Sequence, residues 1–129
     1  MAGVTPTEKL VALSRWIDTP NAHRDPEAQA WSRIAKVSEE NGEVVAAFIG
    51  AIGQNPRKGV THTREDVVEE LLDVALTALA AVEHLRGHDG AALDLLNDKL
   101  DRVAARAGVV TDQPADAARA ARPRPEGAA

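Results

Sequence analysis

The chain has 129 residues, 44% of them hydrophobic, with a net charge of −5 and no cysteine. This size and composition fit one globular domain with a sizeable core. The lack of cysteine excludes disulfides, thiolate catalysis and sulfur-bound zinc, and it fits a reducing cytoplasm, where we expect the protein to act. The negative charge argues against a nucleic-acid partner. No apolar run approaches the roughly 18 residues that cross a bilayer, and residues 1–20 hold no signal-peptide core, so we expect no membrane partner.

The sequence predicts four helices and almost no sheet, because Ala, Leu and Glu dominate and alternating β-branched residues are scarce. The first helix is predicted over residues 6–17, and a loop with Pro20 follows it. The second is predicted over residues 26–52, with Asp25 as its cap and Pro26 at its first position. A loop rich in turn residues comes next, over residues 53–62.

Two more helices complete the predicted fold. Thr63 and Asp66 resemble a capping box, which predicts a third helix that ends near residue 87. That helix is apolar nearly all round between residues 71 and 82, so we expect it to be the central one. Asp89 can cap a fourth helix that ends near residue 108. The expected organisation is one all-α domain over residues 1–108, followed by a flexible tail rich in Ala, Pro and Arg over residues 109–129.

Two acidic motifs are the candidate functional residues of this chain. They are Glu39-Glu40-Asn41-Gly42-Glu43 and Glu70-Leu71-Leu72-Asp73. Each places two carboxylates three residues apart, so each pair shares one face of its helix. Taken singly, such charges are usual on a solvated helix face. Asp73, however, lies among Leu, Val and Ala, where a carboxylate is costly unless a hydrogen bond, a partner such as Lys36 or Arg33, or a metal compensates it. We therefore predict that four carboxylates converge on a divalent cation.

The ligand types narrow the choice of metal. Oxygen ligands with no His or Cys at ligand spacing select Mg²⁺, with Mn²⁺ as a possible substitute. A di-iron bundle site is the main chemical competitor, and it requires Glu-x-x-His on two helices. His84 follows Glu83 directly, and His88 is not three residues after any Glu. The required spacing is therefore absent.

These motifs resemble the EExxE…ExxD pattern of the MazG-like all-α NTP pyrophosphohydrolase superfamily, which includes dimeric dUTPases and dCTP pyrophosphatases. The flanking stretches KVSEE at 36–40 and ELLDV at 70–74 match as well. A third stretch, NDKLDR at 97–102, is similar to the N-x-K-F-x-R-R of MazG proteins, although Val103 replaces the second Arg. The resemblance covers about residues 30–107. It implies a four-helix bundle that assembles as a homodimer or homotetramer.

The resemblance also implies an activity. The family cleaves nucleoside triphosphates between the α and β phosphates, giving a monophosphate and pyrophosphate, which suggests a role in cleaning the nucleotide pool. Glu39 would orient or deprotonate the attacking water. The implied metal ligands are Glu40, Glu43, Glu70 and Asp73.

Substrate contacts are predicted from basic and aromatic residues. Lys99 and Arg102 share one flank of the fourth helix and would hold phosphate oxygens. Arg57 and Lys58 in the loop, and Lys36 beside the first motif, are further candidates. Each of the helix and loop cations also fits an ordinary solvated position. Trp31 is a candidate to stack on the base, and it equally fits a core or dimer-interface residue.

A non-catalytic relative is the alternative, namely a helical module that binds a nucleotide or regulates a partner protein. The complete acidic motifs favour the enzyme, because a non-enzyme has no reason to keep Asp73 in an apolar helix. Val103 in place of an Arg and the presence of only three aromatic residues keep the alternative open. The sequence does not predict the preferred base, the sugar or the number of metal ions.

Overall fold

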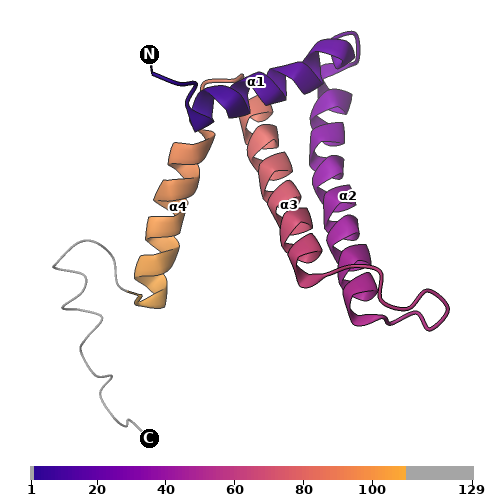
Figure 1. Ribbon diagram of the computed structural model, residues 1–129. Helices are drawn as coiled ribbons and strands as arrows, with labels where there is room; N and C mark the ends of the chain where they lie inside the picture. Colours follow the sequence, from indigo (N-terminus) through magenta and orange to yellow (C-terminus); the bar gives the residue numbers. More distant parts are fainter. Residues whose placement is uncertain (1, 110–129) are drawn as a thin grey trace, which may run out of the picture. The chain divides into compact units, whose positions relative to one another are not determined.

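A computed structural model describes residues 2–109, and over that range the chain is all-helical (Figure 1). Four α-helices and one short 3₁₀ helix are present, and no strand occurs among the described residues. The chain divides into two compact units between Ala92 and Leu93. In the described part, no helix is both long and apolar enough to cross a membrane. Of the predicted tail, only Val109 belongs to the described residues.

The first helix, α1, spans Pro6–Asp18 and begins at a capping box formed by Thr5 and Glu8. It therefore extends one residue beyond its predicted end. The loop expected after it contains a short 3₁₀ helix, η1, at Thr19–Asn21. Thr19 and Asn21 each donate a side-chain hydrogen bond to a carbonyl four residues earlier, which keeps the chain coiled past the end of α1.

Helices α2 and α3 form an antiparallel hairpin. α2 spans Pro26–Ile52, with the Asp25 side chain accepting a hydrogen bond from the Ala28 N–H, and it ends where Gly53 adopts a φ of +64°. α3 spans Arg64–Leu85 and begins at the predicted Thr63–Asp66 capping box. Both helices are confirmed, because their start signals are local and strong.

The loop between the two helices folds back on α2 at Gly50. The Thr61 N–H donates to the Gly50 carbonyl at 3.0 Å. A Cβ atom on Gly50 would lie 2.2 Å from His62 Nδ1 and 2.5 Å from Thr61 Oγ1, so a larger residue would force these side chains to shift. Figure 1 shows the loop at one end of the hairpin and α1 lying across the other end.

The core of the first unit is small and consists mostly of alanine. α3 packs against both α1 and α2, which confirms its central place in this unit. Its apolar run is nevertheless enclosed only near the end that α1 covers, at Ala80 and Ala81. Leu72 remains 57% exposed. The buried hydrophobic residues are Leu10, Ala47, Ala80, Ala81 and Ala92.

The fourth helix, α4, spans Ala92–Ala107. The predicted cap, Asp89, accepts a hydrogen bond from the Ala91 N–H at 3.0 Å. The stronger cap is Glu83, which is fully buried and accepts from the N–H groups of Gly90 at 3.0 Å and Ala92 at 2.9 Å. Sequence reasoning missed Glu83, because a glutamate near the end of one helix gives no sign that it caps the next.

Candidate metal centre and the adjoining cavity

The predicted carboxylates gather into two overlapping groups on the facing sides of α2 and α3. Carboxylate oxygens of Glu40, Glu70 and Asp73 lie within 4.8 Å of one another, and so do those of Glu39, Glu40 and Glu43. Glu40 belongs to both groups. The spacing of three residues within each motif puts each pair on one helix face, and the antiparallel hairpin turns those faces toward each other. All five predicted carboxylates therefore share one region of the hairpin.

The environment of Asp73 differs from the prediction. Asp73 is exposed, whereas Glu40 and Glu70 are partly buried. The expectation of a costly buried carboxylate at Asp73 is wrong for this chain, because its apolar neighbours Leu72 and Leu76 are themselves about half exposed. An apolar stretch of sequence does not ensure a low dielectric when no helix covers it. The case for a metal site therefore depends on the convergence of the carboxylates and not on desolvation.

The carboxylates perturb one another. The charges of Glu39 and Glu40 raise the pKa of Glu43, with smaller contributions from desolvation and from Glu70. The pKa of Glu39 is lowered, chiefly because its carboxylate accepts a hydrogen bond from Lys36. Negative charge has thus accumulated beyond what nearby cations neutralise, and an added cation would relieve the repulsion.

Lys36 is the cation that touches this cluster. Its ammonium donates to Glu39 Oε2 and lies 2.9 Å from Glu40 Oε1. These two hydrogen bonds raise the pKa of Lys36 above its ordinary value. Lys36 does not pair with Asp73, which was one of the partners considered for that carboxylate.

A cavity of about 410 Å³ adjoins the cluster. It lies between α1, α2 and α3. Its wall includes Glu40, which belongs to the carboxylate cluster, and Lys36, which pairs with that cluster. The volume falls within the range of small-molecule sites. The lining residues are Leu13, Trp16, Ile17, Ser32, Arg33, Lys36, Glu40, Leu76, Thr77 and Ala80.

The aromatic residue at this cavity is Trp16 and not the predicted Trp31. Trp16 lines the cavity from α1. Trp31 is not among the lining residues, and both rings are largely exposed, at 73% for Trp16 and 64% for Trp31. Sequence reasoning preferred Trp31 because it shares a helix with the first acidic motif. The position of α1 across the hairpin is what brings Trp16 to the cavity, and no local pattern in the sequence reveals that position.

The other basic residues predicted to contact phosphate are not among the residues that line the cavity. Arg57 and Lys58 are exposed in the loop at the far end of the hairpin from α1. Ile52, the last residue of α2, is nine positions after Glu43, so about 14 Å of helix separates the cluster from that loop. Among the described residues neither cation forms an ion pair with the cluster. Lys99 and Arg102 are exposed on α4 in the second unit, so their role toward phosphate stays a prediction.

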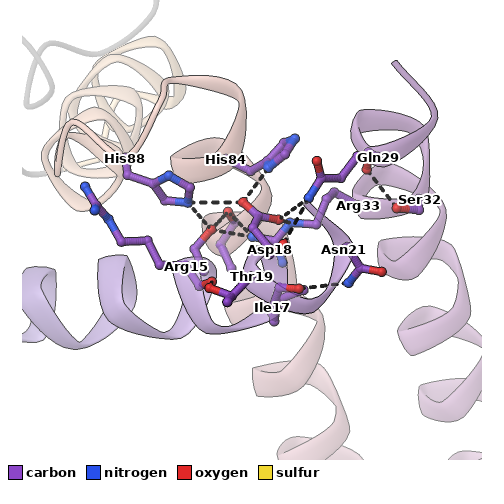
Figure 2. Close-up of polar contacts among 12 residues, drawn as sticks. Arg15, Ile17, Asp18, Thr19, Asn21, Gln29, Ser32, Arg33, His84 and His88 are labelled. Atoms are coloured by element: carbon purple, nitrogen blue, oxygen red, sulfur yellow. Dashed lines mark hydrogen bonds and ion pairs between the residues drawn. The ribbon is translucent and has the colours of Figure 1, made fainter. Parts of the chain in front are cut away.

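A second polar cluster, absent from the predictions, surrounds Asp18 at the end of α1 (Figure 2). Asp18 Oδ2 lies 2.6 Å from His84 Nδ1 and 3.3 Å from His88 Nε2. The other carboxylate oxygen, Asp18 Oδ1, accepts a hydrogen bond from Gln29 Nε2 at 3.3 Å and lies 3.6 Å from Arg33 Nε. Burial lowers the pKa of the Arg33 guanidinium, and the charge of Asp18 partly offsets that effect. One carboxylate thus joins α1, α2 and the end of α3.

Ser14 completes this cluster but is not a catalytic serine. Its hydroxyl donates to the Ala80 carbonyl at 2.9 Å and accepts from Arg33, and the side chain is fully buried. The Ser14 oxygen lies 3.0 Å from His88 Nε2, which is the same nitrogen that faces Asp18. A Ser-His-Asp triad requires the carboxylate on the other imidazole nitrogen. The arrangement therefore holds helices together.

Comparison of the chain with protein-family models, with curated proteins and with solved structures gave no match. The assignment of a function therefore depends on the residues and geometry described above.

Proposed function

We propose that the protein is a Mg²⁺-dependent nucleoside triphosphate pyrophosphohydrolase of the MazG-like all-α superfamily. It would convert a ribo- or deoxyribonucleoside triphosphate into the monophosphate and pyrophosphate, and clean the nucleotide pool of the cytoplasm. The observation that carries the proposal is the convergence of Glu40, Glu70 and Asp73 from two helices. One of the three, Glu40, also lines a cavity of about 410 Å³.

The donor set fits a hard divalent cation. The groups that converge are carboxylates, and the oxygen atoms of three of them come within 4.8 Å of one another. The cluster already holds one positive charge, the ammonium of Lys36. When bound, Mg²⁺ or Mn²⁺ supplies neutralisation of phosphate charge and a lowered pKa for water. The residues that would hold it are Glu40, Glu43, Glu70 and Asp73.

Glu39 is the proposed base. It lies in the same carboxylate group as Glu40 and Glu43, and it is exposed to solvent, so a water molecule can reach it. In the metal-free protein the hydrogen bond from Lys36 lowers the pKa of Glu39, which makes its carboxylate a weaker base while that contact lasts. Glu39 would orient the attacking water or take up its proton.

The cavity is the proposed place for the nucleoside. Its walls are mainly apolar, with Leu13, Ile17 and Leu76 among them, and Trp16 offers an aromatic ring for a base. Since Glu40 and Lys36 form the wall nearest the cluster, a nucleoside here would direct its phosphates toward the carboxylates. Lys99 and Arg102 remain predicted phosphate contacts. Arg57 and Lys58 lie about 14 Å of helix from the cluster and are not assigned to the phosphates. Trp16 replaces Trp31 as the proposed base contact.

The exposed apolar side chains of the hairpin favour a homodimer or homotetramer. A unit with a small alanine core leaves much of its apolar surface in water, and association is the usual way to bury such surface. Large side chains on α2 and α3 that are about half exposed include Val45, Phe48, Ile52, Val68, Leu72 and Leu76.

A non-catalytic nucleotide-binding or regulatory module is the second candidate. The exposure of Asp73 favours it, because an exposed carboxylate is compatible with an ordinary solvated helix face. The two candidates share the cavity but differ in the need for the carboxylates. A binding module keeps its affinity for nucleotide when Glu40 and Glu70 become glutamine, whereas the enzyme loses turnover.

The test is release of pyrophosphate from a panel of canonical and modified nucleoside triphosphates, measured with the full chain in Mg²⁺. We expect release from at least one substrate, and a loss of at least 100-fold for Glu40→Gln. Glu27→Gln is the matched control, because Glu27 is an exposed residue in the first turn of the same helix. Hydrolysis that survives Glu40→Gln unchanged contradicts the proposed site.

A further inference from the structure

We propose that Lys36 is a built-in counterion of the acidic cluster, and that a divalent cation binds there by displacing the Lys36 ammonium. The inference rests on the proposed function, because it concerns the cation assigned to the same carboxylates. Lys36 has two positions in this account. It pairs with Glu39 and Glu40 in the metal-free protein, and it is released toward the cavity when the metal binds.

The contacts of Lys36 place its charge on the central ligand of the cluster. Lys36 precedes Glu39 by three residues and Glu40 by four, so both carboxylates lie within reach on the same helix face. Its Nζ lies 2.9 Å from Glu40 Oε1. Glu40 is the residue that the two carboxylate groups have in common. A cation held by Glu40 and an ammonium in contact with the same carboxylate repel each other, so one excludes the other.

One lysine does not neutralise the cluster. Among the described residues, Lys36 is the only lysine or arginine that forms an ion pair with these carboxylates. Carboxylate oxygens of Glu39, Glu40 and Glu43 lie within 4.8 Å of one another, so repulsion remains among them. The ion pairs of Lys36 are also solvent-exposed, with 53% of its side chain accessible. Exposed pairs of this kind are weak, so a doubly charged ion displaces the ammonium readily.

The cavity offers the displaced ammonium a second position. Lys36 and Glu40 both belong to the cavity wall, so a rotation of the lysine side chain moves its charge from the cluster to the cavity. There the ammonium donates to an oxygen of a phosphate that enters the cavity. Metal binding and substrate contact are thereby coupled through one side chain.

The test is Mn²⁺ binding to the nucleotide-free full chain, measured by calorimetry at low ionic strength. Lys36→Met removes the charge and keeps a long, helix-favouring side chain. The matched control is Lys9→Met, because Lys9 is exposed on α1 and gives the same change in net charge. We expect Lys36→Met to lower the Kd for Mn²⁺ by about 3- to 30-fold, and Lys9→Met to change it by less than about 2-fold. The difference should shrink as salt is added.

The outcomes separate this inference from the proposed function. Equal or weaker Mn²⁺ binding by Lys36→Met, when the unmodified protein binds normally, overturns the inference and leaves the proposed function intact. No Mn²⁺ binding by the unmodified protein at millimolar concentrations contradicts the proposed function itself. If circular dichroism shows that Lys36→Met is not folded, Lys36→Gln takes its place. As a second measurement, the NMR signal of the Lys36 Cε group should shift on addition of Mg²⁺ while that of Lys9 does not, and an unmoved Lys36 signal at saturation also contradicts the inference.

Discussion

Asp18, the last residue of α1, faces His84 near the end of α3, with 2.6 Å between Asp18 Oδ2 and His84 Nδ1. The same carboxylate also lies within ion-pair distance of Arg33 from α2 and of His88 from the turn after α3. It is the point at which three segments of the first unit are held together. The cavity beside the acidic cluster depends on this arrangement, because α1 forms one of its walls.

Asp18→Ala should therefore destabilise the protein strongly. It removes the partner of the buried Arg33 guanidinium, and an unpaired buried charge is expensive. We expect a loss of about 2–4 kcal/mol in the free energy of unfolding, measured by urea denaturation. Asp98→Ala on the exposed face of α4 is the control and should change little. Equal stability of the two variants contradicts a central role for Asp18.

Glu83→Gln should weaken the cap on the backbone at Gly90 and Ala92, where α4 begins. Both oxygens of Glu83 accept backbone N–H groups, from Gly90 and Ala92, in a fully buried position. The glutamine amide turns an N–H group toward one of these donors and leaves it without a partner. We expect a cost of about 1–3 kcal/mol and faster hydrogen exchange at Gly90 and Ala92. Glu69→Gln, exposed on the same helix, serves as the comparison, and unchanged exchange at both amides argues against the cap.

The capping box of α3 predicts a pH dependence. The hydrogen bonds from the Thr63 backbone and side chain lower the pKa of Asp66 below its ordinary value of 3.8. A carboxyl whose pKa is lower in the folded state contributes stability above its unfolded pKa, and the contribution is lost as the pH falls through the folded value. Asp66→Asn keeps an acceptor oxygen but cannot ionise, so it should be less stable than the unmodified protein at pH 6.

The stability difference between Asp66→Asn and the unmodified protein should fade as the pH falls below 3.8. Urea denaturation at a series of pH values measures it. Glu65→Gln removes the same charge from the same helical turn, and Glu65 has no capping hydrogen bond among those of the described residues. A pH-independent difference for Asp66→Asn, or the same profile for Glu65→Gln, speaks against this cap.

Asp73→Asn separates function from stability. Asp73 is exposed, and no hydrogen bond or ion pair holds it within the described part of the chain. Surface substitutions of this kind change the free energy of unfolding by less than about 0.5 kcal/mol. We expect the melting temperature of the metal-free variant to be unchanged while turnover is lost. A marked fall in the melting temperature, or full turnover, would show that the role given to Asp73 is wrong.

Local signals predicted the helices of this protein well. Asp25 with Pro26, and Thr63 with Asp66, start α2 and α3 at the expected positions, because a cap is made by residues close together in the sequence. The meeting of Glu40 with Glu70 and Asp73 also follows from short spacings and an antiparallel hairpin. What the sequence did not show depends on contacts between distant residues.

The position of α1 is the clearest example. Its placement across the hairpin brings Trp16 to the cavity and Asp18 to Arg33, and neither contact has a local signature. The exposure of Asp73 was missed for a related reason. An apolar helix face is buried only if another element covers it, and α1 covers α3 only toward its end, at Ala80. The periodicity of apolar residues predicts which face of a helix is apolar, but it does not predict which element packs against that face.

The most direct measurement of the central claim is identification of the products by ³¹P NMR, after incubation of the full chain with a mixture of nucleoside triphosphates and Mg²⁺. The account predicts nucleoside monophosphate and pyrophosphate in equal amounts, and no hydrolysis once EDTA is added. A diphosphate with orthophosphate, hydrolysis that persists in EDTA, or intact triphosphates with both Mg²⁺ and Mn²⁺ would contradict it.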